Sequence, residues 1–310
     1  VGFKTVLAKD VTGCTELTDA VCGAMADFLP LAPVHNRIYL DVIHAFRSLV
    51  NIPLVGLFET AFHTEIPARA YLYGIPYAYT EKYGIRKYGF HGASHRYVSE
   101  FVRRNLRPDK KDDRIISCHL GGSSSVCAVR GGVSVDTSMG MSPQSGLLNA
   151  KRTGDLDPFA LLYLMEREGF SIEEVRQMLI SESGLLGISG HSADFRDIEE
   201  AVDQGDERSE QAFDAFTYGV KRYIGEYLAV LNGADVIAFT AGLGENSPRV
   251  RRAVLADMEN LGIVLDPEKN AAGEQIISAD NSRVTVVVVP TNEELVVARA
   301  VRDYLKTPHH

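Results

Sequence analysis

A loop of glycine and serine in the middle of the sequence has the composition of a phosphate-binding site. Residues 114–130 consist of two apolar, strand-like runs joined by Gly121, Gly122 and three serines. Glycine removes side-chain bulk and accepts positive φ, while serine hydroxyls add donors beside bare backbone N–H groups. The stretch predicts a β-hairpin that holds phosphate against its backbone, although an ordinary glycine-rich turn has the same composition.

A histidine precedes a predicted helix in the segment GFHGASHRYV. Ser94 is expected to cap this helix, so that His91 lies just before the helix N-terminus, where anions are favoured. His91 and His95 could instead form a metal pair at helical spacing, but the glycine and the cap place His91 outside the helix and a third ligand is not evident. We therefore favour an anion contact.

Two cations stand in a long loop of small residues that precedes a helix at Pro158. Small neighbours give the long side chains of Lys151 and Arg152 little to pack against. Reaching an anion would explain them, and a solvated basic pair is the alternative.

Two strands end in segments that could bind a nucleotide or a metal. The strand 235–240 leads into a glycine-rich loop, residues 241–246, after which Ser247 caps a helix over 248–260. Strand, glycine loop and helix N-terminus is an arrangement that binds nucleotides, although any tight turn can contain a lone G-x-G. The strand 284–289 is followed by Glu293, whose carboxylate could complement the dipole of the final helix or bind Mg²⁺.

The elements that must position these residues alternate between strands and helices. Strands are expected at 2–8 and 53–58, with a helix capped by Thr18 and another over 37–49 between them, which is the pattern of a parallel sheet covered by helices. A long helix over 206–231 should face the core with six apolar side chains at helical spacing: Phe213, Phe216, Val220, Ile224, Tyr227 and Leu231.

Composition limits the class of protein. The 310 residues suggest two lobes that share a cleft, with 45% hydrophobic and 24% charged residues. A formal net charge of −9 argues against non-specific nucleic-acid binding. Four cysteines without metal-ligand spacing, and no apolar run long enough for a membrane span, predict a cytoplasmic protein without a membrane partner. Val1 in place of an initiator methionine suggests a longer polypeptide, and His309-His310 are either native or a tag remnant.

Six motifs in order along the chain resemble those of the acetate kinase family, within the actin and hexokinase superfamily: GFHGASHRYV, CHLGGSSSVCAV, SVDTSMGMSP, KRTGDLDP, FTAGLGENSPRVR and PTNEELVVAR. The resemblance implies an α/β fold of two ribonuclease-H-like lobes with an interdomain cleft. Residues 1–61 would form a partial N-terminal lobe, with 294–310 packing back on it, and 62–293 the nucleotide-binding lobe. It also implies reversible phosphoryl transfer between ATP and a short-chain carboxylate, acetate first, with Mg²⁺ and in a homodimer.

The same resemblance assigns roles to residues. The catalytic residues would be His91, Arg152 and Lys4. ATP or ADP would be bound by His119, Gly121, Gly122, Ser123, Asp194, Phe195, Arg196, Gly242, Gly244, Glu245 and Asn246. The alkyl group of the substrate would contact Val6, Val34, Phe90 and Pro143. The metal would be bound by Glu293 and Glu59.

The chain departs from the family pattern at four points. Lys4 replaces an arginine and loses its bidentate fork, Glu59 replaces an aspartate, and Gly122 replaces an asparagine. The family's Asn-x-Gly-Ser-Ser phosphate loop does not occur in the sequence. An acetate kinase is therefore the leading hypothesis, and a nucleotide-binding relative with little or no kinase activity, or a propionate or butyrate kinase, is the alternative.

Overall fold

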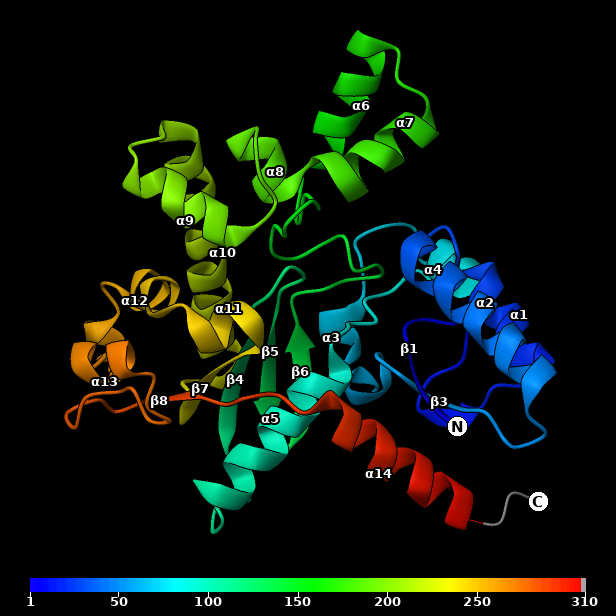
Figure 1. The fold of residues 1–310 in the computed structure, drawn as a ribbon, viewed down its shortest axis with the longest axis horizontal. Coiled ribbons are helices and arrows are strands. Elements are labelled where there is room, and N and C mark those ends of the chain that lie inside the picture. The colour runs from blue at the N-terminus through cyan, green and yellow to red at the C-terminus, as the bar shows by residue number, and fades with distance from the viewer. Residues whose placement is uncertain (308–310) are drawn as a thin grey trace. The chain divides into compact units, whose positions relative to one another are not determined.

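The computed structural model describes residues 1–307, apart from the side chain of Val34, so His309 and His310 lie outside the described residues. The chain forms two compact units (Figure 1). The first unit comprises 1–113, 129–143 and 291–310, and the second comprises 114–128 and 144–290. These units are defined by packing, and the lobe boundaries expected at 61/62 and 293/294 stay a prediction.

The first unit contains a three-stranded sheet in the order β1-β3-β2. Strand β1 (Gly2–Thr5) runs parallel to β3 (Val55–Phe58), and β2 (Cys14–Glu16) runs antiparallel to it. Helices α1 (Asp19–Asp27) and α2 (Pro33–Leu49) are neighbours that pack through a core around Met25, Ile43 and Phe58. The N-cap of α1 is Thr18, which confirms that prediction.

Helix α14 (Glu293–Lys306) also packs on this sheet, because Val297 and Val301 share a core cluster with Val55 and Leu57. Its neighbour is α5 (Gly92–Asn105). The remaining elements of this unit are the 3₁₀ turn η1 (Ala61–His63), α3 (Ala68–Tyr71), α4 (Tyr77–Tyr83) and β6 (Val133–Thr137). The expectation that Ser94 caps α5 is wrong, since the helix begins at Gly92 and its N-cap residue is His91.

A second sheet has the strand order β6-β5-β4-β7-β8. Strands β4 (Arg114–His119), β7 (Val236–Thr240) and β8 (Thr285–Val288) are parallel, and β5 (Ser125–Arg130) follows β4 after the glycine and serine loop. Nearly every residue of these strands is buried, so they form the core of the second unit. The predicted α/β class is confirmed.

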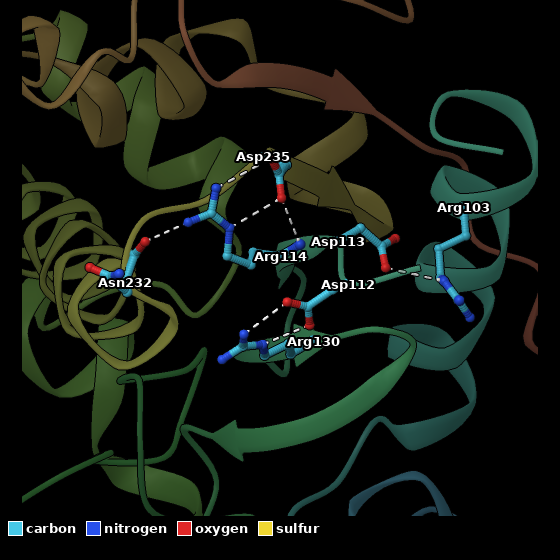
Figure 2. Close-up of polar contacts among 7 residues, drawn as sticks. All are labelled: Arg103, Asp112, Asp113, Arg114, Arg130, Asn232 and Asp235. Carbon is cyan, nitrogen blue, oxygen red and sulfur yellow. Dashed lines mark hydrogen bonds and ion pairs between the residues drawn. The ribbon is translucent and has the colours of Figure 1, made fainter. Parts of the chain in front are cut away.

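Charged residues hold the start of β4 in place (Figure 2). In the second unit, the guanidinium of Arg114 donates to the carboxylate of Asp235 and to the carbonyl of Asn232, beside the C-terminal end of α10. In the first unit, Arg130 donates through two nitrogens to Asp112, with both distances 2.8 Å. A bidentate pair of this kind fixes geometry as well as adding energy.

The helices of the second unit complete the fold. The long helix α10 (Glu207–Leu231) buries all six predicted core side chains. The helix expected over 248–260 is shorter, since α12 (Pro248–Leu255) ends before Asp257, whose φ is 56°. The others are α6 (Pro158–Glu168), α7 (Ile172–Gln177), η2 (Met178–Glu182), α8 (Gly184–Ser189), α9 (Phe195–Asp203), α11 (Ala241–Asn246), η3 (Glu259–Leu261) and α13 (Pro267–Ala272). None of the helices described is long and apolar enough to cross a bilayer.

Candidate active site

A pocket of about 640 Å³ in the second unit brings together three segments that are far apart in the sequence. They are the turn between β4 and β5, the N-terminus of α9, and α11. The predicted nucleotide residues that line the pocket are Gly121, Gly122, Asp194, Phe195, Arg196, Gly242 and Asn246. Their convergence from three places makes this pocket the best candidate for nucleotide in the described part of the second unit.

Hydrogen bonds within the second unit fix the glycine loop. The backbone N–H of Gly121 donates to Ser124 Oγ at 3.0 Å, and the hydroxyl of Ser124 lies 2.9 Å from the Gly121 carbonyl. The N–H of Ser124 donates to Asn149 Oδ1 at 2.6 Å. A side chain at Gly122 would meet open space, so this glycine is not required by packing. His119 is the last residue of β4, opposite Thr240, and is buried.

The segment expected to be a glycine loop at 241–246 is instead the short helix α11. The helix begins at Ala241, which has a φ of 65° and donates its N–H to Glu245 Oε1 at 2.8 Å. The carboxylate of Glu245 therefore turns back onto its own helix. Asn246 does the same, because its side-chain amide donates to the carbonyl of Gly242 at 2.8 Å.

A buried arginine supports α11 from behind. Arg251 is 0% exposed, and its Nη1 donates to the carbonyls of Gly244 and Glu245, both at 2.9 Å. Its Nε and Nη2 donate to the side-chain and backbone oxygens of Asn270 at 2.8 and 3.0 Å. Burial lowers the pKa of Arg251. Sequence reasoning missed this residue, and no local pattern distinguishes it from the exposed Arg252 beside it.

The N-terminus of α9 presents an ion pair and an aromatic ring at the pocket. Asp194 is the N-cap and pairs with Arg196, whose side chain is 88% exposed, at 2.6 Å. The side-chain hydrogen bond from Arg196 lowers the pKa of Asp194 to about 2. The ring of Phe195 contacts that of Phe216 of α10, with centroids 5.1 Å apart. This contact anchors the turn while the ion pair stays in solvent.

In the first unit, a lysine lies between the two predicted metal ligands. Lys4 Nζ is 3.1 Å from Glu59 Oε1 and in close contact with Glu293 Oε2. Burial alone would lower the pKa of Lys4, but the two carboxylates outweigh it and raise the pKa above its ordinary value. Burial raises the pKa of Glu59, which the charge of Lys4 opposes. The three residues come from β1, the end of β3 and the first turn of α14.

The carboxylates of this cluster suit a hard divalent cation. Glu59 is 5% exposed, and its Oε2 has no hydrogen-bond partner among the described residues. Within residues 1–307, no group of three or more His, Cys, Asp or Glu is arranged as a metal cage. Mg²⁺ is commonly held by one or two carboxylates, with water and substrate phosphates as the other ligands. Glu59 and Glu293 therefore fit Mg²⁺ as a pair.

A buried histidine supports the backbone at His91, which is the N-cap of α5 and has a φ of 55°. His63 lies 2.9 Å through Nε2 from the carbonyl of Phe90 and 2.8 Å through Nδ1 from Ser134 Oγ. The carbonyl can only accept, so Nε2 carries the proton and Nδ1 accepts from the hydroxyl. Burial lowers the pKa of His63 to about 4, and sequence reasoning missed this residue.

The first residue of helix α5 also contacts the backbone of Glu59, which directly follows β3. The N–H of Gly92 donates to the Glu59 carbonyl at 3.0 Å, and a Cβ at position 92 would lie 2.2 Å from that oxygen. Only glycine allows this approach, so His91 and Glu59 are joined through one backbone contact.

Arg152 lies in the second unit, in the ordered loop before α6. Its carbonyl accepts from the N–H of Asn149 at 2.9 Å, which ties it to the residue that holds the glycine loop. Burial lowers the pKa of Arg152 to about 10, so its guanidinium remains charged at neutral pH. His91 belongs to the other unit, and the joint role of the two residues stays a prediction.

The structure describes three of the four side chains that were predicted to contact the alkyl group of the substrate. Val6 and Phe90 are buried in one cluster with Met139, and Pro143 is buried nearby in sequence. The side chain of Val34 lies outside the described residues. The structure thus brings two of the four residues into contact with the same core, in the first unit.

Curated proteins similar to this chain are acetate kinases. The acetate kinase of Natranaerobius thermophilus is 48% identical over 309 residues, covering 98% of this chain and 78% of that protein. The acetate kinase of Methanosarcina barkeri is 47% identical over 311 residues, covering 99% of this chain and 76% of that protein.

Solved structures agree with these sequences. The chain matches Porphyromonas gingivalis acetate kinase with a TM-score of 0.89 and 40% identity, covering 98% of this chain and 77% of that one. It matches a propionate kinase from Francisella tularensis with a TM-score of 0.92 and 34% identity, covering 97% and 78%. The model of the acetokinase family matches residues 4–299. The chain therefore belongs to the acetokinase family, whose members are phosphotransferases with a carboxyl group as acceptor.

Proposed function

We propose that this protein transfers the γ-phosphoryl group of ATP to a carboxylate oxygen of acetate, and catalyses the reverse reaction. The observation that carries the proposal is the 47–48% identity to acetate kinases over nearly the whole chain. In the forward direction an acetate oxygen forms a bond to the γ-phosphorus. The bond from that phosphorus to the bridging oxygen breaks, and ADP leaves with the electron pair.

The pocket in the second unit is the proposed nucleotide site. Adenosine lies at Asp194, Phe195 and Arg196, and the phosphates lie between the glycine loop and α11. Support comes from the convergence of these segments on one pocket of about 640 Å³. His119 and Ser123, next to the glycine loop, and Gly244 and Glu245, on α11, complete the proposed set.

His91 and Arg152 are the proposed catalytic residues. Phosphoryl transfer passes through a loose transition state with charge on its equatorial oxygens, so positioned cations and hydrogen bonds stabilise it more than a nucleophile would. The charged, half-buried Arg152 and the fixed backbone of His91 suit that role. Lys4 supplies a further cation, in the place of the family's arginine.

Glu59 and Glu293 are the proposed Mg²⁺ ligands. When bound, Mg²⁺ neutralises charge on the phosphates. The alkyl group of the substrate lies against Val6, Val34, Phe90 and Pro143. We further propose a cytoplasmic homodimer, on the family resemblance alone.

Propionate is a second candidate substrate, because a propionate kinase is among the closely matching structures. The test is acyl phosphate formation from ATP and Mg²⁺ with acetate, propionate and butyrate, trapped as hydroxamate. Formation of acetyl hydroxamate with the highest kcat/KM among the three acids is expected. A preference for propionate would change the substrate, and ADP binding without any hydroxamate would favour the non-catalytic relative.

A further inference from the structure

The cluster of Lys4, Glu59 and Glu293 already contains a cation. Lys4 Nζ contacts one carboxylate oxygen of Glu59, at 3.1 Å, and one of Glu293. The side chains of the two glutamates are 6% and 15% exposed, and that of Lys4 is 39% exposed. The partly exposed side chain of Lys4 therefore places its ammonium against two largely buried carboxylates.

The carboxyl groups of the cluster outnumber its cations. Glu59 and Glu293 share the single ammonium of Lys4. The backbone N–H of Ala93 also contacts the Glu59 carboxyl group, but Glu59 Oε2 is buried without a hydrogen-bond partner among the described residues. A buried carboxylate oxygen in this state is costly unless a cation or a donor reaches it. The cluster is thus built to accept more positive charge than Lys4 provides.

We infer that the ammonium of Lys4 is a tethered cation that competes with Mg²⁺ for Glu59 and Glu293. This inference rests on the proposed function, since it takes the two glutamates as the metal ligands. Mg²⁺ requires oxygens at about 2.0–2.1 Å in near-octahedral geometry. An ammonium in contact with both carboxylates fills the space where such an ion would lie.

The structure provides room for the ammonium to move away. A pocket of about 650 Å³ opens beside it, lined by Lys4, Thr291, Glu293 and Glu294 and by small apolar residues of α14. Lysine has a long stem with several rotatable bonds, so its head can leave the carboxylates without a change in the backbone. Exchange of Lys4 for a divalent ion therefore needs only a side-chain movement.

The test measures metal binding to the protein without nucleotide. Mn²⁺ serves as the probe, and its free concentration is followed by electron paramagnetic resonance in the unaltered protein and in Lys4→Met. We expect Lys4→Met to bind Mn²⁺ at least tenfold more tightly. The matched control is Lys306→Met, which removes the same charge from an exposed site on α14 and should change the affinity less than twofold.

Two further variants show that the added affinity comes from this cluster. Lys4→Arg keeps a cation and should bind Mn²⁺ as weakly as the unaltered protein. Lys4→Met combined with Glu293→Gln should lose the gain. Equal or weaker Mn²⁺ binding by folded Lys4→Met overturns the inference.

A second measurement uses the unaltered protein, so that it holds even if Lys4→Met does not fold. Acetic anhydride labels accessible amines, and mass spectrometry reports labelling at each lysine. Millimolar Mg²⁺ should raise labelling of Lys4 several-fold and leave Lys306 unchanged, whereas no change at Lys4 overturns the inference. Neither measurement uses turnover, so its failure is distinct from failure of the proposed kinase activity.

Discussion

At the scale of single residues, the proposed chemistry depends on the charge of Arg152, and burial makes the charged form of this side chain less favourable. Burial lowers the pKa of Arg152 to about 10, which is still well above neutral pH. The guanidinium therefore keeps its charge although the residue is half-buried. A charge held in this way interacts strongly with the charge that develops on a transferring phosphoryl group.

Replacing Arg152 by alanine should lower kcat by about a hundredfold or more, since the loss falls mainly on the transition state. The KM for ATP should change only a few-fold. Arg167→Ala, on the exposed surface of α6, is the control and should behave as the unaltered protein. Steady-state kinetics that showed a higher KM and an unchanged kcat would make Arg152 a ground-state contact.

The protonation of a single side chain, His63, is expected to make the stability of the protein depend on pH. It is 1% exposed and its pKa is about 4, compared with an ordinary value of 6.5. The unfolded chain therefore takes up a proton between these values while the folded protein does not. Stability is highest above pH 6.5 and falls as the pH is lowered toward 4.

We expect His63 to reduce the free energy of unfolding by about 3 kcal/mol between pH 6.5 and 4. Urea unfolding across this range should show a smaller decrease for His63→Gln than for the unaltered protein. His44→Gln, on the exposed surface of α2, controls for the loss of a histidine. The same pH dependence in His63→Gln would show that other groups are responsible.

The three residues of the cluster of Lys4, Glu59 and Glu293 could be identified from the sequence, but the contacts between them could not. Lys4, Glu59 and Glu293 were each singled out by the resemblance to the acetate kinase family. The lysine and Glu293 are separated by 289 positions, and no local pattern predicts which charges meet across such a distance. Arg251 and His63 were missed for the same reason, because their partners lie on other elements.

At the scale of elements, the short helix α11 depends on Arg251. Six residues are too few for a stable isolated helix, so the carbonyls of Gly244 and Glu245 need the guanidinium behind them. The other face of α11 lines the pocket proposed to bind nucleotide. The arginine therefore connects the packing of the second unit to its proposed binding surface.

Arg251→Met should destabilise the second unit by on the order of 3 kcal/mol, because it leaves buried carbonyls unpaired. It should also weaken ADP binding at temperatures where the protein remains folded, as measured by calorimetry. Arg251→Lys should recover part of the affinity. Arg252→Met removes an exposed neighbour and should change neither quantity, and unaltered ADP affinity in folded Arg251→Met would contradict this role.

Helices whose apolar residues recur at helical spacing could be predicted from the sequence. The residues at which helices begin and end were predicted less accurately. The core face of α10 follows from its apolar spacing, and all six predicted residues are buried. The predicted start of α5 and the predicted end of α12 were wrong. His91 and Asp257 adopt positive φ values at these ends, and tertiary contacts select such values. The loop at 241–246 forms a helix for a similar reason, because its support comes from Arg251.

At the scale of the whole molecule, each unit contributes a different part of the proposed reaction. The first unit holds His91 and the carboxylates of Glu59 and Glu293, and the second holds Arg152 and the proposed nucleotide pocket. Family membership could be predicted because the six motifs occur in order over nearly the whole chain. The preference for one short carboxylate could not, since it depends on the fit of a few apolar side chains.

The central claim is that a carboxylate oxygen becomes bonded to the γ-phosphorus of ATP. Acetate labelled with ¹⁸O in its carboxyl group, incubated with ATP, Mg²⁺ and the protein, tests this bond directly by ³¹P NMR. An acetyl phosphate signal shifted by the bridging ¹⁸O, together with ADP, is the expected result. Release of ADP and phosphate without any acyl phosphate signal, or no reaction at all, would contradict it.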